Sequence, residues 1–142
     1  MLFIIKWTML KRVLIILILF FAPSLSAAEE RTATSLVHAG FLYPNGVDLA
    51  GYTVERSIAD NVYYFYTFGF PSLAAAGLSY YADYEGNGLS GTIGVGLGSV
   101  LYASLVYQWK IADKQYLKTG AGFTTGIAYT GAYPALSYEH RF

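Results

Sequence analysis

Apolar and polar residues alternate along the last nine positions of the chain. From Leu136 onward every second side chain is large and apolar or amphipathic, and Ser137, Glu139 and Arg141 fall between them. A period of two places the two kinds of side chain on opposite faces of a β-strand. The pattern therefore predicts a final strand over residues 134–142, which ends on an aromatic residue.

Turn signals divide the rest of the chain into segments with the same alternation. Residues typical of turns occur at 44–46, 59–61, 71–72, 85–88 and 112–115. Residues 129–133 are expected to form the last connection. Together with the final strand, the pattern predicts eight strands, at residues 35–43, 49–58, 62–70, 74–84, 89–98, 101–111, 116–128 and 134–142.

A short internal repeat supports this division. The tripeptide Ile-Ala-Asp occurs at 58–60 and again at 111–113, each time after an alternating segment and before an aromatic one. The two copies are 53 residues apart, from Asp60 to Asp113. Divided over four strands, this distance gives roughly 13 residues for each strand with its connection, which suits membrane-crossing strands of about 9–11 residues.

The composition favours a membrane β-protein over a soluble one. Charged residues make up 13% of the chain and hydrophobic residues 55%, whereas a soluble domain of ordinary composition carries about 25% charged residues. Beyond the first segment there is no run of apolar residues long enough for a membrane helix. The predicted fold class is therefore all-β: an eight-stranded antiparallel up-and-down transmembrane barrel, closed because lipid cannot satisfy an open strand edge.

The first 28 residues have the layout of a secretory signal peptide. Lys11 and Arg12 precede the apolar run at 13–22, and small residues follow Pro23. Cleavage is expected after Ala28, with Ala27 as the second candidate, so that the barrel occupies residues 29–142. An uncleaved membrane anchor is the alternative, and initiation at Met1 or at Met9 is left open.

The end of the chain resembles the closing strand of bacterial outer-membrane β-barrels. In those proteins a terminal Phe, with aromatic or apolar residues at alternate positions upstream, forms the signal read by the barrel-assembly machinery. Tyr138 and Phe142 match that pattern. The resemblance implies the cell outer membrane of a Gram-negative bacterium, with barrel-assembly machinery, lipid and lipopolysaccharide as partners.

The predicted layout is similar to the membrane domain of the OmpA and OmpX group, but the connections are short at both ends. Binding barrels commonly use long external loops. Short loops therefore favour contacts within the membrane, with lipid or with a second barrel in a homo-oligomer. The leading hypothesis is a structural or interfacial role without enzymatic activity.

Six charged residues fall on the predicted inward face. They comprise three acids and three bases, all in the strand halves near the predicted periplasmic turns: Glu55, Asp83, Lys110, Lys118, Glu139 and Arg141. Because buried charges persist only when paired and hydrogen-bonded, we expect a neutral ion-pair cluster that plugs the lumen. The alternative is six independent charges in water near the strand ends.

Glycines and aromatic residues give two further expectations. Gly94, Gly96, Gly98, Gly122 and Gly126 would line the outer half of the lumen, where aromatic rings pack on them or an acyl chain fills the space. Two interfacial aromatic belts are also predicted. One contains Tyr64, Tyr107, Trp109, Tyr116, Tyr138 and Phe142, and the other contains Tyr43, Phe70, Tyr129 and Tyr133.

The residues that support catalysis are sparse. The two histidines, His38 and His140, have no Ser or carboxylate at a spacing typical of a nucleophile motif. His38 would have Ser35 as its nearest hydroxyl, with Glu139 at the wrong depth. The chain lacks Cys, no metal site or cofactor is predicted, and the balanced charge gives no indication of nucleic acid. The alternatives kept open are a lipid A acyl-modifying enzyme that uses His38, a narrow channel, and a periplasmic lipocalin-like barrel with its faces reversed.

Overall fold

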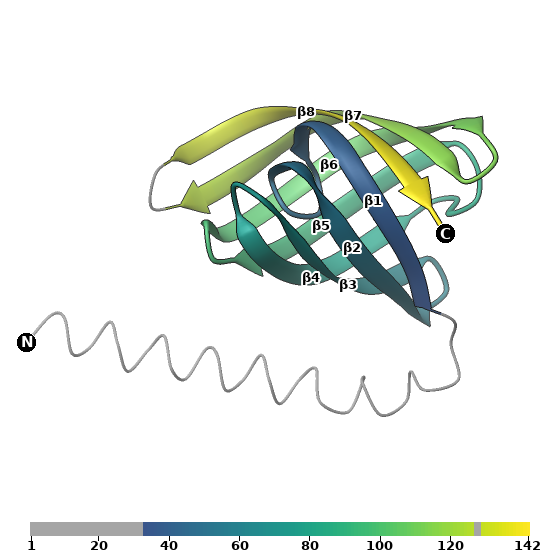
Figure 1. The fold of residues 1–142 in the computed structure, drawn as a ribbon, viewed down its shortest axis with the longest axis horizontal. Helices are drawn as coiled ribbons and strands as arrows, with labels where there is room; N and C mark the ends of the chain where they lie inside the picture. Colours follow the sequence, from purple (N-terminus) through teal and green to yellow (C-terminus); the bar gives the residue numbers. More distant parts are fainter. Residues whose placement is uncertain (1–32, 127–128) are drawn as a thin grey trace, which may run out of the picture. The chain divides into compact units, whose positions relative to one another are not determined.

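The computed structural model describes residues 33–126 and 129–142 as one closed, antiparallel up-and-down β-barrel (Figure 1). Each strand pairs with its neighbours in sequence, and β1 also pairs with β8, which closes the sheet. The predicted all-β, eight-stranded barrel is thereby confirmed. The strands are β1 (Ala33–Tyr43), β2 (Asp48–Ala59), β3 (Val62–Phe70), β4 (Leu73–Tyr81), β5 (Gly88–Gly96), β6 (Ser99–Ala112), β7 (Gln115–Gly126) and β8 (Thr130–Arg141).

The predicted signal peptide, residues 1–28, lies outside the described residues. Within residues 33–126 and 129–142, no helix has the length and apolar character needed to cross a membrane.

Two predicted strand boundaries were wrong by three residues or more. The fourth strand ends at Tyr81 instead of residue 84, because the chain leaves the ladder before the glycine-rich turn at 85–88. The eighth strand begins at Thr130, so most of the predicted connection at 129–133 is strand. Gly131 and Pro134 are common in turns, but here they pair with Thr124 and Ala121 of β7.

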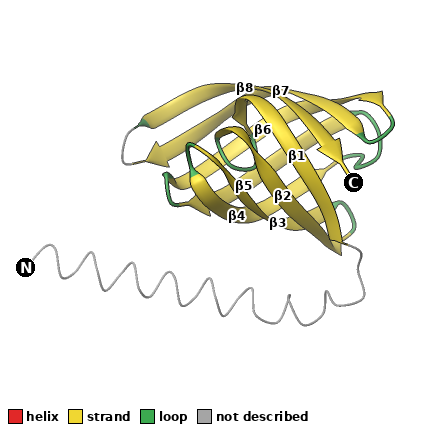
Figure 2. Cartoon of the chain, viewed as in Figure 1, coloured by secondary structure: helices red, strands yellow, loops and turns green. Residues whose placement is uncertain are grey.

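The repeated Ile-Ala-Asp tripeptide marks two tight turns of the same kind. The β2–β3 connection passes through Asn61 at φ 62°, and the β6–β7 connection passes through Lys114 at φ 57°. Asparagine tolerates this left-handed conformation better than most residues. These two turns and the β4–β5 connection lie at the end of the barrel that carries Ala33 and Arg141, here named the terminal end (Figure 2).

The barrel wall has apolar side chains outside and polar side chains inside. Ile93, Leu101, Leu105 and Trp109 point outward with 58%, 56%, 60% and 47% of their surface exposed. On each strand, the residues that alternate with the outward set point inward. Many of them are polar and buried: Thr53, Glu55, Thr92, Gln108, Lys118, Ser137, Glu139 and Arg141. The alternation read from the sequence therefore matches the two faces of the sheet.

The connection between β1 and β2 folds into the lumen. All residues from Tyr43 to Asp48, here named the inserted turn, are buried. The Tyr43 carbonyl accepts hydrogen bonds from the backbone N–H groups of Gly46 and Val47, at 3.3 and 2.8 Å, which holds the turn compact. At its root, a side chain on Gly40 would meet the backbone of Ser137 at 2.5 Å, so only glycine permits this close approach to β8.

Candidate functional site

The candidate site is the polar interior of the barrel, and its centre is one carboxylate that binds two cations. Lys118 Nζ lies 2.6 Å from Oε2 of Glu139, and Arg141 Nε lies 2.6 Å from Oε1 of the same residue. Lys118 and Glu139 are fully buried, and Arg141 is 3% exposed. The neighbouring strands β7 and β8 supply all three side chains, so the two cations share one anion.

The second buried acid, Glu55, is held by neutral donors. Its Oε1 accepts hydrogen bonds from Asn45 Nδ2 at 2.8 Å and from the Tyr81 hydroxyl at 2.6 Å. Among the described residues no Lys or Arg lies within 4.0 Å of this carboxylate, as an ion pair would require. The Tyr81 hydroxyl also accepts a hydrogen bond from Lys118 Nζ at 3.2 Å, which links Glu55 to the Lys118–Glu139 pair.

Arg141 closes the network at the terminal end. Its Nη2 donates to Oε1 of Gln108 at 2.7 Å, and its Nη1 donates to the carbonyl of Tyr84. The guanidinium carbon lies 3.9 Å from the ring centre of Tyr84 and 4.0 Å from that of Tyr116, within the range of cation–π attraction. The two aromatic rings and the hydrogen bonds hold the Arg141 guanidinium in one position inside the lumen.

Tyr84, in the β4–β5 connection, covers the network from the same side. Its hydroxyl donates to Oε2 of Glu55 at 3.0 Å. Burial, and then the Glu55 carboxylate, raises the pKa of the Tyr84 phenol above its ordinary value. The phenol therefore stays protonated and remains a donor.

The structure brings four of the six predicted lumen residues together. Glu55, Lys118, Glu139 and Arg141 form the set here named the charged cluster, with two acids and two bases. It remains neutral overall, as the sequence indicated. Their burial excludes the alternative of independent solvated charges for these four residues.

Asp83 and Lys110 are exposed, and their assignment to the lumen was wrong. Because β4 ends at Tyr81, Asp83 lies in the following connection, where its Oδ1 accepts hydrogen bonds from the backbone of Glu85 and Gly86 at 3.1 and 2.9 Å. Lys110 lies near the end of β6, and its side chain is exposed although it falls on the same side of the strand as the inward residues Val106 and Gln108.

The sequence reading missed the uncharged members of this network. Tyr81 and Gln108 lie two residues before Asp83 and Lys110, on the face that the alternation predicts to point inward, so strand periodicity held the signal for both. Tyr84 takes the place in the network that was assigned to Asp83. Asn45 lies in a turn, and no periodic pattern shows whether a turn points into or away from a barrel.

The inserted turn fills the middle of the lumen and bonds to side chains from four strands. The Tyr43 hydroxyl donates to Oε2 of Glu139 at 2.5 Å. Asn45 binds Glu55, as described above, and accepts from the Thr92 hydroxyl at 2.9 Å through its side-chain oxygen. The Tyr102 hydroxyl donates to the Asn45 backbone carbonyl at 3.0 Å.

Aromatic rings fill the other half of the lumen. A side chain added to Gly94 would meet the Tyr102 ring at 2.5 Å, and one added to Gly122 would meet the Tyr133 ring. Both rings are buried, with Phe65 and Val47 in the same apolar cluster. The expected packing of aromatic rings on glycine is confirmed at Gly94 and Gly122, and these rings occupy the space considered for an acyl chain. Gly98 was wrongly assigned to the lumen, since it is exposed and lies against Ser72.

The environment of His38 differs from the expectation in two respects. Ser35 faces the outside, where its hydroxyl accepts from Tyr52 at 2.8 Å, so it is not the partner of His38. Glu139 is the register partner of His38 on β8, so the depth predicted for it was wrong. The His38 ring is 3% exposed and stacks on Tyr43 with a centroid distance of 3.7 Å.

The Asp48 carboxylate and the Ser72 hydroxyl form a buried pair close to His38. His38 Nε2 is 3.9 Å from Oδ2 of Asp48, and the other oxygen of Asp48 accepts hydrogen bonds from the backbone N–H and hydroxyl of Ser72. The hydroxyl of Ser72 is thus bound to the carboxylate and not to the imidazole, an arrangement unlike that of an activated nucleophile. The described part of the chain holds no group of three or more His, Asp or Glu side chains suited to a metal ion.

The predicted aromatic belts are partly corrected. Tyr107, Trp109, Tyr138 and Phe142 are exposed toward the terminal end, and Phe70 and Tyr129 are exposed toward the other end. Tyr43, Tyr116 and Tyr133 were wrongly assigned to the belts, since all three are buried in the interior. Tyr64 is also buried, with 7% of its surface exposed, so it does not belong to an exposed belt. Tyr116 on β7 and Tyr133 on β8 occupy positions whose side chains point inward. Tyr43 is buried because the inserted turn, to which it belongs, lies inside the lumen.

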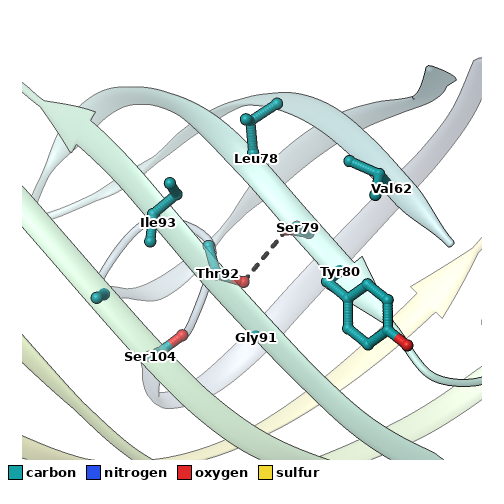
Figure 3. A pocket seen from close by; sticks show the side chains of 9 residues that line it. Val62, Leu78, Ser79, Tyr80, Gly91, Thr92, Ile93 and Ser104 are labelled. Carbon is teal, nitrogen blue, oxygen red and sulfur yellow. Dashed lines mark hydrogen bonds between the residues drawn. The ribbon is translucent and has the colours of Figure 1, made fainter. Parts of the chain in front are cut away.

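A shallow apolar groove lies on the outer wall around Gly91. Leu78, Tyr80 and Ile93 surround this glycine on β4 and β5 (Figure 3). A Cβ atom added to Gly91 would find its nearest neighbour, the carbonyl oxygen of Ser104, at 3.8 Å, an ordinary van der Waals contact, so the floor accommodates a methyl group. The groove belongs to the same outward face as the exposed apolar side chains.

No protein-family model, curated protein or solved structure matches the chain.

Proposed function

We propose that this chain is a bacterial outer-membrane protein, a transmembrane barrel with a sealed lumen and a structural or interfacial role. The observation that carries the proposal is the inverted wall, in which large apolar side chains cover the outside and a charged cluster lies inside. A soluble barrel of this size gains its stability by burying apolar side chains inward. The opposite arrangement is the one that acyl chains stabilise.

Residues 1–28 act in this proposal as the secretory signal that delivers the chain across the inner membrane. Tyr138 and Phe142 act as the assembly signal, and both are exposed toward the terminal end, Tyr138 on β8 and Phe142 directly after it. That end would face the periplasm. The outward surface then contacts lipid and lipopolysaccharide, and the short connections leave little protein outside the membrane.

The sealed lumen favours this role over conduction or catalysis. The charged cluster, the inserted turn and the tyrosine rings follow one another along the bore. His38, the residue considered for acyl chemistry, is covered by the Tyr43 ring. Contacts at the outer wall therefore remain as the main means of interaction.

The test is cell fractionation combined with gel mobility. Expressed with its own leader, the protein is expected in the outer-membrane fraction. It is also expected to migrate differently before and after boiling, because folded membrane barrels resist detergent. Recovery in the soluble periplasmic fraction, with one mobility in both samples, would overturn the proposal.

A further inference from the structure

We propose that the inserted turn is a displaceable plug, which opens the lumen as a water-filled vestibule when it swings out. The inference rests on the proposed membrane insertion. The floor of the vestibule is the Lys118–Glu139–Arg141 part of the charged cluster, which the turn does not supply. The opened lumen is therefore a dead-end compartment and not a continuous channel.

Polar contacts, which water can replace, hold the tip of the turn. Tyr43 and Asn45 bind Glu139, Glu55, Thr92 and Tyr102 through hydrogen bonds of 2.5 to 3.0 Å. A hydrogen bond to protein contributes little net free energy when both groups regain water on separation. These contacts select the closed position. The turn also buries the Val47 side chain in the apolar cluster with Phe65 and stacks the Tyr43 ring on His38, so opening exposes both side chains.

The root of the turn holds backbone strain on both sides. Leu42 has φ 55° and Val47 has φ 57°, in the left-handed region. That region is unfavourable for residues other than glycine, and most of all for a β-branched side chain such as Val47. A turn that leaves the lumen is free to relax both angles, so the strain favours opening.

Unsatisfied polar atoms lie at the same root. Both ring nitrogens of His38 and Oδ2 of Asp48 are buried without a hydrogen-bond partner in the described structure. Such atoms cost free energy until they meet water or another partner. Opening the lumen hydrates them, and it also separates the His38 ring from Tyr43, on which it stacks.

Part of the wall that the turn would uncover is polar, beside the apolar part formed by the cluster around Phe65 and Tyr102. Thr53, Thr92 and Ser137 face the lumen and are buried in the closed form. The hydroxyl of Ser137, close to the root at Gly40, has no partner in the described structure. Water entering this space finds donors and acceptors on the walls, which makes a wet vestibule stable.

The experiment uses single cysteines as reporters, since the chain has none of its own. Ser137→Cys, and Thr53→Cys as a second reporter, are placed in the full-length protein reconstituted into lipid vesicles. The rate of labelling by a charged thiol reagent is measured. A loosened form carries Tyr43→Phe and Asn45→Ala, and a matched control carries Tyr107→Phe and Asn87→Ala, which remove the same groups outside the lumen.

The loosened form is expected to label at least tenfold faster than the parent at either lumen reporter, with the matched control unchanged. A reporter at Ser90→Cys, on β5 toward the terminal end, is expected to stay slow in all forms. Equal labelling in the loosened form and the parent would overturn the plug. Vesicle flotation and gel mobility are recorded for every sample, so failure to insert, which would count against the proposed function, is seen separately.

Discussion

The Tyr43 hydroxyl donates a hydrogen bond of 2.5 Å to Glu139, and the same carboxylate binds both buried cations of the lumen. Residues from the first and last strands thus meet at one charged group. Because β1 and β8 are also the strands that close the sheet, this contact joins the closure of the barrel to the filling of its interior.

Glu139→Gln is expected to destabilise the barrel strongly. The change removes the anion shared by Lys118 and Arg141 and leaves two buried cations without a direct counter-charge, at a cost of about 3–5 kcal/mol. Urea unfolding in detergent, followed by gel mobility, measures the loss. Asp113→Asn, in an exposed turn, is the matched control and should leave the midpoint unchanged. A midpoint equal to that of the parent would show that the cluster does not stabilise the fold.

Gly94→Ala and Gly91→Ala should have different effects on stability, because Gly94 lies on the inner face of β5 and Gly91 on the outer face. A methyl group at Gly94 meets the Tyr102 ring at 2.5 Å, whereas at Gly91 its nearest neighbour is 3.8 Å away. Forcing a methyl into a packed interior costs about 1–3 kcal/mol, so only Gly94→Ala should lower the unfolding midpoint. Equal effects of the two substitutions would contradict the assignment of inner and outer faces.

Ile93→Lys tests the outward face in the middle of β5. Ile93 is 58% exposed, so a lysine there disturbs no packed core. In a bilayer, however, a lysine facing lipid near the midplane costs about 2–4 kcal/mol. Folding into vesicles should therefore be impaired relative to Asp113→Lys, whose charge lies in a turn. Identical folding yields would contradict contact with acyl chains.

Removal of Phe142 tests the proposed assembly signal. Phe142 is 62% exposed, and its backbone N–H donates to the carbonyl of Ser35 at 2.8 Å. We expect a lower yield of folded barrel in cells, with an unfolding midpoint close to that of the parent for the barrel folded in detergent. Phe142→Tyr, which keeps an aromatic terminus, is the control. A normal cellular yield of folded barrel after deletion of Phe142 would contradict its role in the assembly signal.

Much of the fold was predictable because two-residue alternation is a local property. It gave all eight strands, and β3 has the predicted bounds. The same alternation correctly placed Glu55, Lys118, Glu139 and Arg141 on the inward face. The exceptions lie where a strand stops: Asp83 was read as a continuation of β4, but the chain leaves the ladder after Tyr81.

The inserted turn could not be predicted from the same pattern. Pro44, Asn45 and Gly46 correctly indicate a turn, but a turn of this composition fits either side of a barrel rim. Its direction depends on contacts with residues far away in the sequence, such as Glu139, and on left-handed angles at Leu42 and Val47. Periodicity carries no information on either.

The central claim is that the outer wall lies against acyl chains, and Trp109 offers the most direct measurement. The chain has two tryptophans, Trp7 and Trp109, so a form that begins at Glu29 reports from the outward-facing Trp109 alone. In vesicles whose lipids carry bromine near the head-group end of the acyl chain, its fluorescence is expected to be strongly quenched, while soluble iodide has little effect. Fluorescence that iodide quenches and brominated lipid leaves unchanged would contradict the account.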